Sequence, residues 1–323
     1  EESRDLNMLA NIASQMAKDW IADGQPGDPA PIWTGDRYIP NPKVNDVFNW
    51  TPSNQCPVNM EEPLRYDKFK TQLAALTPND IIWCDYTVEV DDKADPEGKK
   101  KKTVRSIAPF GWLIEYGDTA YIVMRGTQNE YDGKIDTMAA KVINPIAGFG
   151  KGKTHNGFTI AYKGLGPAGE ERPADVPGIS LYDALNNTTK TKIKIGGHSL
   201  GSAISTLITN YAQTFNKFNR IEGYVSASPT VGNQIYADYF NALQDKDGNM
   251  LGNTFYRLTN KNDIVPMIPG SWLQYIAVAQ EVLFDAPYTD PDNLVKTAKN
   301  HQICCCYAYA LKHPLDVFNP ANE

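Results

Sequence analysis

The chain has 323 residues, 41% of them hydrophobic, and a formal net charge of -7 at pH 7. This acidic balance argues against a nucleic-acid partner and leaves no polybasic patch for anionic lipid. No apolar run approaches the roughly 20 residues of a transmembrane helix, and the first ten residues lack the charged-then-apolar pattern of a signal peptide. Because the chain begins with Glu1, it stays open whether a leader has been removed or the sequence has been trimmed. We expect a single domain over residues 1–323.

The N-terminal part, residues 1–78, is expected to form a helical and loop extension packed on the main body. Apolar residues recur at helical spacing over 6–22, which predicts an amphipathic helix. Prolines and glycines recur over 24–63 among isolated aromatic residues, which is typical of an ordered loop. A second helix is expected at about 63–76.

Three strand patterns follow, at 81–90, 106–117 and 119–124. A charged hairpin tip, residues 91–102, separates the first two strands, and Gly117 and Asp118 form the turn between the second and the third. This part of the chain therefore predicts an antiparallel arrangement of neighbouring strands.

The second half of the chain alternates between strand and helix patterns. The expected elements are a helix at 179–187, a strand at 192–195, a helix at 200–215, a strand at 221–229, a helix at 233–243 and a strand at 254–260. Such alternation predicts an α/β fold with a largely parallel sheet and helices on its faces.

The pentapeptide GHSLG, Gly197 to Gly201, lies where the strand at 192–195 gives way to a helix. A serine on such a sharp turn needs small residues two positions before and after it, because larger ones would collide with the neighbouring strand and helix. The first turn of the helix also directs N–H groups toward a developing negative charge. We interpret Ser199 as a nucleophile; a merely structural turn is the alternative.

A serine nucleophile requires a base, and the chain has four histidines. In folds with this nucleophile turn, the acid and then the histidine follow the serine along the chain. His155 and His198 therefore come too early. We prefer His301, which begins an apolar helical pattern, over His313, which follows that pattern and precedes Pro314.

The acid that orients the histidine is expected on a loop just past a strand end. Asp263 follows the predicted strand at 254–260 and precedes Pro266, which fixes the chain after the turn. The alternative for Asp263 is a turn-forming aspartate that is satisfied by its own backbone.

Five motifs now stand in a recognisable order, and through them the chain resembles the class 3 (fungal-type) lipase family of α/β-hydrolases. The motifs are MRGT at 124–127, HNGF at 155–158, GHSLG at 197–201, ASPTVGN at 227–233 and NDIVP at 262–266. The resemblance covers roughly Val104 to Leu311. It implies an α/β-hydrolase fold, in which helices flank a central, mostly parallel sheet. Met124 and Thr230 depart from the family's usual phenylalanine and arginine at these positions.

The resemblance also assigns further roles. It implies that Thr127 and the backbone N–H of Leu200 bind the oxyanion. It implies a lid within residues 128–154, which covers the site in water and moves away at a lipid surface. The apolar face of this lid would contain Ile135, Met138, Ala139, Val142, Ile143 and Ile146. A fixed connecting helix is the alternative.

The function that follows is hydrolysis of carboxylic esters of lipids, as in a triacylglycerol lipase or carboxylesterase, through an acyl-enzyme. Phospholipase A1 or acyltransferase activity would use the same residues, and a non-catalytic lipid-binding module is the alternative of another class. The substrate is a lipid or other ester, and the chemistry needs no cofactor or metal. The family resemblance favours a secreted protein.

The five cysteines leave two possibilities open. Cys56 and Cys84 could form a disulfide, although the sequence cannot show that they meet. Cys304, Cys305 and Cys306 are consecutive, which is typical of a buried helix start rather than of a tetrahedral zinc site. A thiol or metal site on these three residues is the alternative interpretation.

Overall fold

The structure is a computed structural model of the chain. It describes residues 5–7, 9–10, 13–14, 49–50, 64–65, 69–91, 100–128, 130–144, 150–285, 300–301 and 307. Most of the predicted loop at 24–63 lies outside these residues, as do Cys56, His313 and the three consecutive cysteines.

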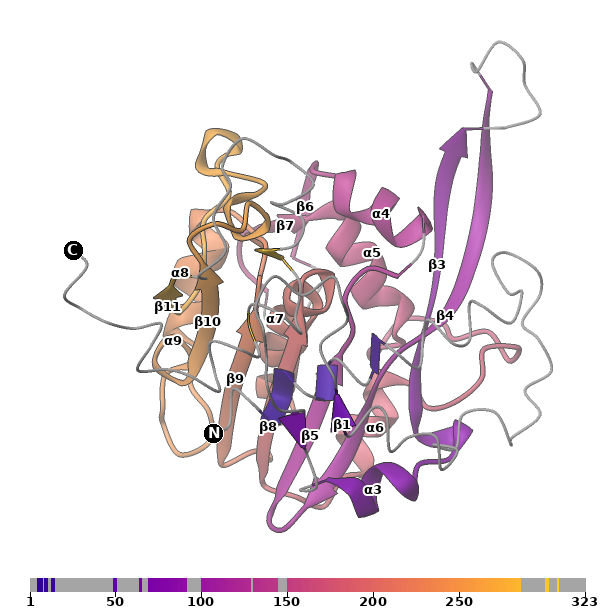
Figure 1. The fold of residues 1–323 in the computed structure, drawn as a ribbon, viewed down its shortest axis with the longest axis vertical. Coiled ribbons are helices and arrows are strands. Elements are labelled where there is room, and N and C mark those ends of the chain that lie inside the picture. The colour runs from indigo at the N-terminus through magenta and orange to yellow at the C-terminus, as the bar shows by residue number, and fades with distance from the viewer. Residues whose placement is uncertain are drawn as a thin grey trace.

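A twisted central sheet runs through the molecule (Figure 1), and in the described residues its spatial order is β11-β10-β9-β8-β5-β4-β3. The strands are β3 Ile81–Asp91, β4 Lys101–Tyr116, β5 Thr119–Met124, β8 Lys192–His198, β9 Arg220–Ser226, β10 Phe255–Asn260 and β11 Gln280–Phe284. The strands from β5 to β11 pair in parallel, whereas β3, β4 and β5 pair antiparallel. The predicted α/β fold with a mostly parallel sheet is confirmed.

Helices and short two-stranded sheets surround the central sheet. The helices are α3 Lys70–Ala74, α4 Glu130–Thr137, α5 Asn156–Gly164, α6 Leu181–Asn187, α7 Leu200–Thr214, α8 Gln234–Ala242 and α9 Leu251–Thr254, with 3-10 turns η2 Pro78–Asp80, η3 Val265–Met267 and η4 Ser271–Leu273. The short strands are β1 Asn49–Trp50, β2 Leu64–Arg65, β6 Lys141–Ile143 and β7 Lys153–His155. Within the described residues, no helix is long and apolar enough to cross a bilayer.

Each face of the sheet has its own hydrophobic core, because side chains alternate along the strands. On one face, Ile82 and Tyr86 of β3 join the apolar sides of α5, α6, α7 and α8. On the other face, Trp83 packs with α3 and with the N-terminal residues. Leu6 is fully buried there, and a Cβ on Gly196 of β8 would lie only 2.7 Å from its Cβ. The described N-terminal residues thus cover the sheet.

Helix and strand lengths differ from the predictions at several places, of which two bear on the site and on the N-terminal part. The helix predicted at 63–76 is only α3, and Leu64 and Arg65 instead pair with Trp50 and Asn49. The strand predicted at 192–195 extends to His198, because both neighbouring strands continue to pair with it up to the turn. The nucleophile motif therefore begins inside the strand.

Part of the predicted lid is tied to the core by a buried ion pair. Arg125 Nη1 lies 2.7 Å from Asp132 Oδ2, and neither side chain is exposed to solvent. Asp132 also accepts hydrogen bonds from Tyr86 Oη at 2.5 Å and from the Gln128 N–H at 2.9 Å. Because Asp132 belongs to α4, a movable lid that included α4 would have to separate this buried pair.

Cys84 is a free thiol in the core of the sheet. Its Sγ donates to the carbonyl of Ala161 at 3.1 Å. Burial raises the pKa of Cys84 well above its ordinary value, so the thiol stays protonated. Cys56, the other half of the possible disulfide, lies outside the described residues.

The buried pair predicts a large effect on stability. Asp132→Ala should lower the free energy of unfolding by about 3–5 kcal/mol, because the Arg125 guanidinium is left buried without its carboxylate. Urea unfolding followed by circular dichroism measures the change. Asp118→Ala removes the surface pair with Lys192 and should leave the urea midpoint near that of wild type. Equal losses in the two variants would contradict the anchoring role of Asp132.

Candidate active site

Ser199 stands at a strained turn between β8 and α7. Its φ of 55° lies in the left-handed region, which is uncommon for a residue with a side chain. A Cβ on Gly201 would lie 2.4 Å from the carbonyl oxygens of Met124 and Arg125, and one on Gly197 would lie 2.5 Å from the Gly201 oxygen. The predicted need for small residues on both sides of the serine is confirmed.

The end of β9 holds this turn in place. The carbonyl of Ser226 accepts from the Ser199 N–H at 3.1 Å and from the Ser202 hydroxyl at 2.6 Å. Ser202 also reaches the carbonyl of Gly197 at 2.8 Å. Ser199 is the N-cap of α7, so the N-terminus of that helix, with its partial positive charge, lies beside the hydroxyl.

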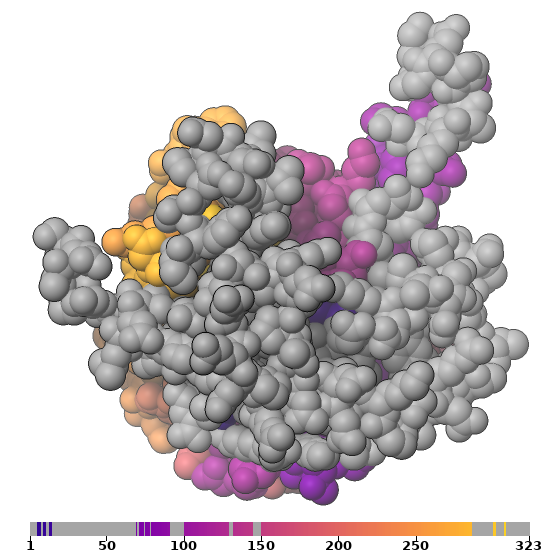
Figure 2. Space-filling model, viewed as in Figure 1, coloured from indigo at the N-terminus to yellow at the C-terminus, as the bar shows by residue number. Residues whose placement is uncertain are grey.

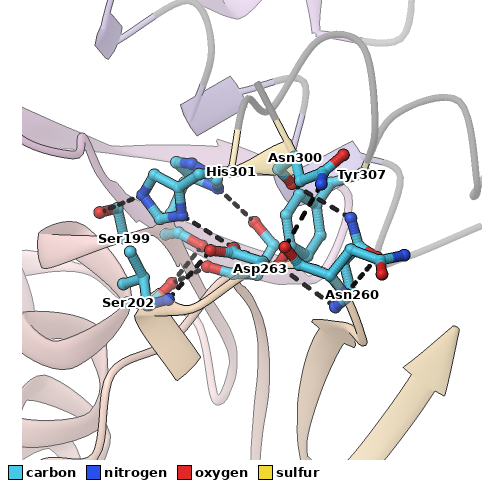
Figure 3. Close-up of polar contacts among 12 residues, drawn as sticks. Ser199, Ser202, Asn260, Asp263, Asn300, His301 and Tyr307 are labelled. Atoms are coloured by element: carbon cyan, nitrogen blue, oxygen red, sulfur yellow. Dashed lines mark hydrogen bonds and ion pairs between the residues drawn. The ribbon is translucent and has the colours of Figure 1, made fainter. Parts of the chain in front are cut away.

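The structure brings Ser199, His301 and Asp263 into one hydrogen-bonded row (Figure 3). His301 Nε2 lies 2.7 Å from Ser199 Oγ, and His301 Nδ1 lies 2.8 Å from Asp263 Oδ2. Asp263 is buried, whereas the His301 side chain is 23% exposed. A carboxylate facing Nδ1 favours the tautomer protonated there, which leaves Nε2 free to accept the serine proton.

The two oxygens of Asp263 have separate tasks. Oδ1 accepts from the Val265 N–H at 3.0 Å, which is the local turn expected of an aspartate at this position. Oδ2 faces His301 and also accepts from Tyr307 Oη at 2.7 Å. One oxygen of Asp263 therefore makes the local turn, and the other faces His301.

Two asparagines join the residues around His301 to the end of β10 (Figure 3). Asn260 Nδ2 donates to the carbonyl of Asn300 at 3.2 Å, and Asn300 Nδ2 donates to the carbonyl of Asn262 at 3.3 Å. The acid and the histidine are thus fixed relative to the same strand end, although 38 residues separate them in the chain.

The loop after β5 lies against the nucleophile turn. A Cβ on Gly126 would lie 3.0 Å from the His198 oxygen and 3.3 Å from Ser199 Cβ, so the close approach favours glycine. Thr127 follows directly, and its hydroxyl donates to Asp136 Oδ2 at 2.7 Å. Burial raises the pKa of Asp136 to about 6. Leu200 is the first residue of α7.

His198 comes too early in the chain to be the base, yet it contacts the site. Its Nδ1 lies 2.9 Å from Ser226 Oγ, and its imidazole centroid lies 4.8 Å from that of His301. Burial, and then the neighbouring His301, lower the pKa of His198 well below its ordinary value, which keeps the ring neutral. Only its place beside Ser199 in the motif could have signalled this role.

The thiol or metal site considered for the three consecutive cysteines lies outside the described residues. Within the residues that the structure does describe, no group of three His, Cys, Asp or Glu side chains is placed to hold a metal ion. His301, which precedes the cysteines by only a few residues, is directed at Ser199 and Asp263.

A family sequence model matches the region of the chain that contains most of this site. The sequence model of the family described as lipase (class 3) matches residues 121–272. Over this region the chain is similar to the class 3 lipase family. Thr127, Ser199 and Asp263 lie within the matched residues, and His301 follows them.

Curated relatives match only part of the chain. The secreted mono- and diacylglycerol lipase A of Penicillium cyclopium is 33% identical over 107 residues, which are 33% of this chain and 32% of that protein. The secreted mono- and diacylglycerol lipase 1 of Fusarium solani is 28% identical over 160 residues, which are 49% of this chain and 41% of that protein. The chain thus spans well under half the length of these relatives.

Solved structures resemble the chain at low identity. The Rhizomucor miehei triacylglyceride lipase gives a TM-score of 0.42 at 21% identity, covering 54% of this chain and 60% of that one. A mutant of MDLA from Penicillium cyclopium gives a TM-score of 0.41 at 19% identity, covering 58% of this chain and 63% of that one.

The contacts of His198 predict an effect on turnover. His198→Phe keeps an aromatic ring but removes the hydrogen bond to Ser226. We expect kcat for a soluble ester to fall by about 10- to 100-fold with little change in KM, because His301 is displaced while no substrate-binding group is lost. His198→Gln, whose amide can replace the hydrogen bond to Ser226, should recover part of the loss. A similar fall in kcat for His155→Phe, a buried histidine bonded to Phe158 instead, would show that the effect is not specific.

The pKa of Asp136 predicts a pH-dependent stability. Because this pKa is raised from 3.8 to about 6 in the folded protein, the contribution of the protonated carboxyl is present in full below about pH 4 and is lost as the pH rises through about 6. Asp136→Asn should therefore gain stability relative to wild type between pH 4 and pH 7, by up to about 3 kcal/mol. Calorimetric unfolding at each pH measures this gain. The exposed Asp238→Asn serves as the control, and a difference for Asp136→Asn that does not vary with pH would contradict the assignment.

Proposed function

We propose that this protein is a serine hydrolase that cleaves carboxylic esters of lipids, with acylglycerols as the substrate class. The observation that carries this proposal is the position of His301, whose two ring nitrogens lie 2.7 Å from Ser199 Oγ and 2.8 Å from Asp263 Oδ2. The names of the curated relatives, which are mono- and diacylglycerol lipases, support the substrate class.

The first half of the proposed reaction forms an acyl-enzyme. Ser199 Oγ attacks the ester carbonyl carbon while its proton passes to His301 Nε2, and Asp263 stabilises the charged imidazole. The N–H of Leu200, together with the N–H and hydroxyl of Thr127, would bind the oxyanion of the tetrahedral intermediate. The intermediate collapses as the ester C–O bond breaks, and the departing alcohol takes the proton from His301.

The second half releases the fatty acid. A water molecule attacks the acyl-enzyme carbonyl and gives its proton to His301 Nε2, which returns it to Ser199 Oγ when the acyl bond breaks. The strained conformation of Ser199 favours this cycle, because it keeps the hydroxyl fixed between the base and the helix N-terminus.

The protonation state of Asp136 sets how much the Thr127 hydroxyl contributes to binding of the oxyanion. A hydroxyl has one hydrogen, and a charged Asp136 would take that hydrogen for its own hydrogen bond. A protonated Asp136 can instead donate to Thr127 Oγ1, which releases the threonine hydrogen toward the oxyanion. In the proposed mechanism, the Leu200 and Thr127 N–H groups act at every pH, whereas the hydroxyl acts fully only when Asp136 is protonated.

Replacement of the proposed triad tests the function directly. Ser199→Ala and His301→Ala should each lower kcat/KM for p-nitrophenyl esters by about 10⁴-fold or more, and Asp263→Asn by about 10³- to 10⁴-fold. The measurement uses acyl chains from short to long, so that the chain-length profile separates a short-chain esterase from a lipase.

His313→Ala is the matched control, since it replaces the other histidine that follows Ser199 in the chain, and it should retain activity. A fluorophosphonate probe should label the wild type at Ser199 and leave Ser199→Ala unlabelled. If the wild type is not labelled and cleaves no ester, the protein is a binding module and the proposed function fails.

A further inference from the structure

One buried side chain, that of Asn260, contacts both of the segments that supply the proposed acid and base. Asn260 is the last residue of β10 and is not exposed to solvent. Its Oδ1 accepts from the N–H of Asn262 at 3.2 Å, and its Nδ2 donates to the carbonyl of Asn300 at 3.2 Å. Asn262 directly precedes Asp263, and Asn300 directly precedes His301. The two ends of one amide therefore hold the residue before the acid and the residue before the histidine.

The two hydrogen bonds also fix which way this amide points. An asparagine side chain has an acceptor at one end and a donor at the other. Its partners here are an N–H on one side and a carbonyl on the other, so only one of the two orientations of the Asn260 amide satisfies both. An apolar side chain of the same size would satisfy neither partner. The contacts at position 260 therefore favour an amide.

Asn300 makes a second bond to the segment that carries the acid. Its Nδ2 donates to the carbonyl of Asn262 at 3.3 Å, and its side chain is buried. Figure 3 shows Asn260 and Asn300 to the right of Asp263, whereas Ser199 lies at the left. The residue before the acid is thus held through its N–H by Asn260 and through its carbonyl by Asn300.

A separate path joins the same strand end to the acid. The backbone N–H of Asn260 donates to Tyr307 Oη at 3.3 Å, and that hydroxyl donates to Asp263 Oδ2 at 2.7 Å. This path uses the backbone of Asn260 rather than its side chain. A change of the Asn260 side chain therefore removes its contacts with Asn262 and Asn300 while the donors to Asp263 remain.

The loop that carries Asp263 is anchored at its buried start. Strand β10 ends at Asn260, and the orange segment that follows it reaches the molecular surface at the upper left of Figure 2. Met267 in that segment is 59% exposed. His301 comes from a segment that lies about 40 residues further along the chain, since Asn260 and Asn300 are 40 residues apart. The relative position of the acid and the histidine therefore depends on contacts between the two segments.

We propose that Asn260 and Asn300 are positioning residues, which hold His301 Nδ1 against Asp263 Oδ2 and thereby keep Nε2 directed at Ser199. We call them the asparagine pair. The inference rests on the proposed function for its effect on turnover. Positioning of the imidazole matters for rate, because a misplacement of about 1 Å can cost about 100-fold.

Asn260→Leu tests the asparagine pair, because leucine has a similar volume but makes neither side-chain hydrogen bond. We expect kcat for p-nitrophenyl acetate to fall by about 10- to 100-fold with KM nearly unchanged, since no group that would touch the ester is replaced. Asn300→Ala removes only the bond to the Asn262 carbonyl and should lower kcat by about 3- to 10-fold. Because both residues act on one junction, the double variant should lose less activity than the product of the two single losses.

Asn210→Leu serves as the control, since it makes the same change at another fully buried asparagine. Asn210 lies on α7, and its Oδ1 accepts a hydrogen bond from Asn144. This variant should lower the urea midpoint, as Asn260→Leu does, but leave kcat near that of wild type. An equal fall in kcat in the two leucine variants would overturn the proposal, and so would wild-type kcat in Asn260→Leu. If Asn260→Leu does not fold, kcat of Asn300→Ala decides in its place.

A proton resonance separates this inference from the proposed function. In the wild type, the His301 Nδ1–H that faces Asp263 should give a signal far downfield of the backbone amides, which His301→Ala identifies by its loss. Asn260→Leu should weaken this signal through exchange with water, whereas Asn210→Leu should keep it. The proposal fails if the wild type lacks the signal or if Asn260→Leu leaves it unchanged. If no protein cleaves an ester, the proposed function fails, while the resonance still decides whether the asparagine pair positions His301.

Discussion

The site depends on one steric constraint, the close approach of the first turn of α7 to the end of β5. Only glycine fits at position 201, because any Cβ there would overlap the carbonyls of Met124 and Arg125. This approach places the loop that carries Thr127 against the strained turn at Ser199. The same loop carries Arg125, whose buried pair with Asp132 fixes α4 to the same point. One contact between backbones therefore locates the serine, the proposed oxyanion donors and the first helix of the predicted lid.

His301 comes to this site from a distant part of the chain. Its position is held by polar contacts rather than by a steric constraint. Asn260 and Asn300 link the backbone beside His301 to the end of β10, and the ring of His198 lies against the His301 ring with the two centroids 4.8 Å apart. Hydrogen bonds in a buried setting are directional, so together they fix the imidazole more narrowly than apolar packing would. The neutral state of His198 suits this role, since a charged ring 4.8 Å from His301 would oppose the positive charge that the proposed mechanism develops.

Local patterns predicted the elements around Ser199 well, because the strand, the glycines and the helix of the nucleophile turn are adjacent in the sequence. The expected positions of β5, α7 and α8 agree with the structure to within a few residues. The contacts of His198 could not be predicted, because Ser226 and His301 are distant from it in the chain. The contact of Asp136 with Thr127 could not be predicted, because Asp136 becomes buried only on folding. Asp132 of α4 gave the opposite signal, because it resembles a solvent-facing residue in the sequence but forms a fully buried ion pair with Arg125. The sequence also allowed a longer helix before β3 than the structure forms.

The loop that follows Asp263 helps to hold the carboxylate in place. The 3-10 turns, the prolines and the hydrogen bonds from Thr230 and Lys141 hold residues 264–274 in one conformation. A loop that had to become ordered when substrate binds would lose conformational entropy at that step, and its motion would be transmitted to the adjacent Asp263. Because this loop is already ordered, the carboxylate at its base keeps its hydrogen bond to His301. Within the proposed function, rigidity of this loop therefore contributes to a pre-organised triad.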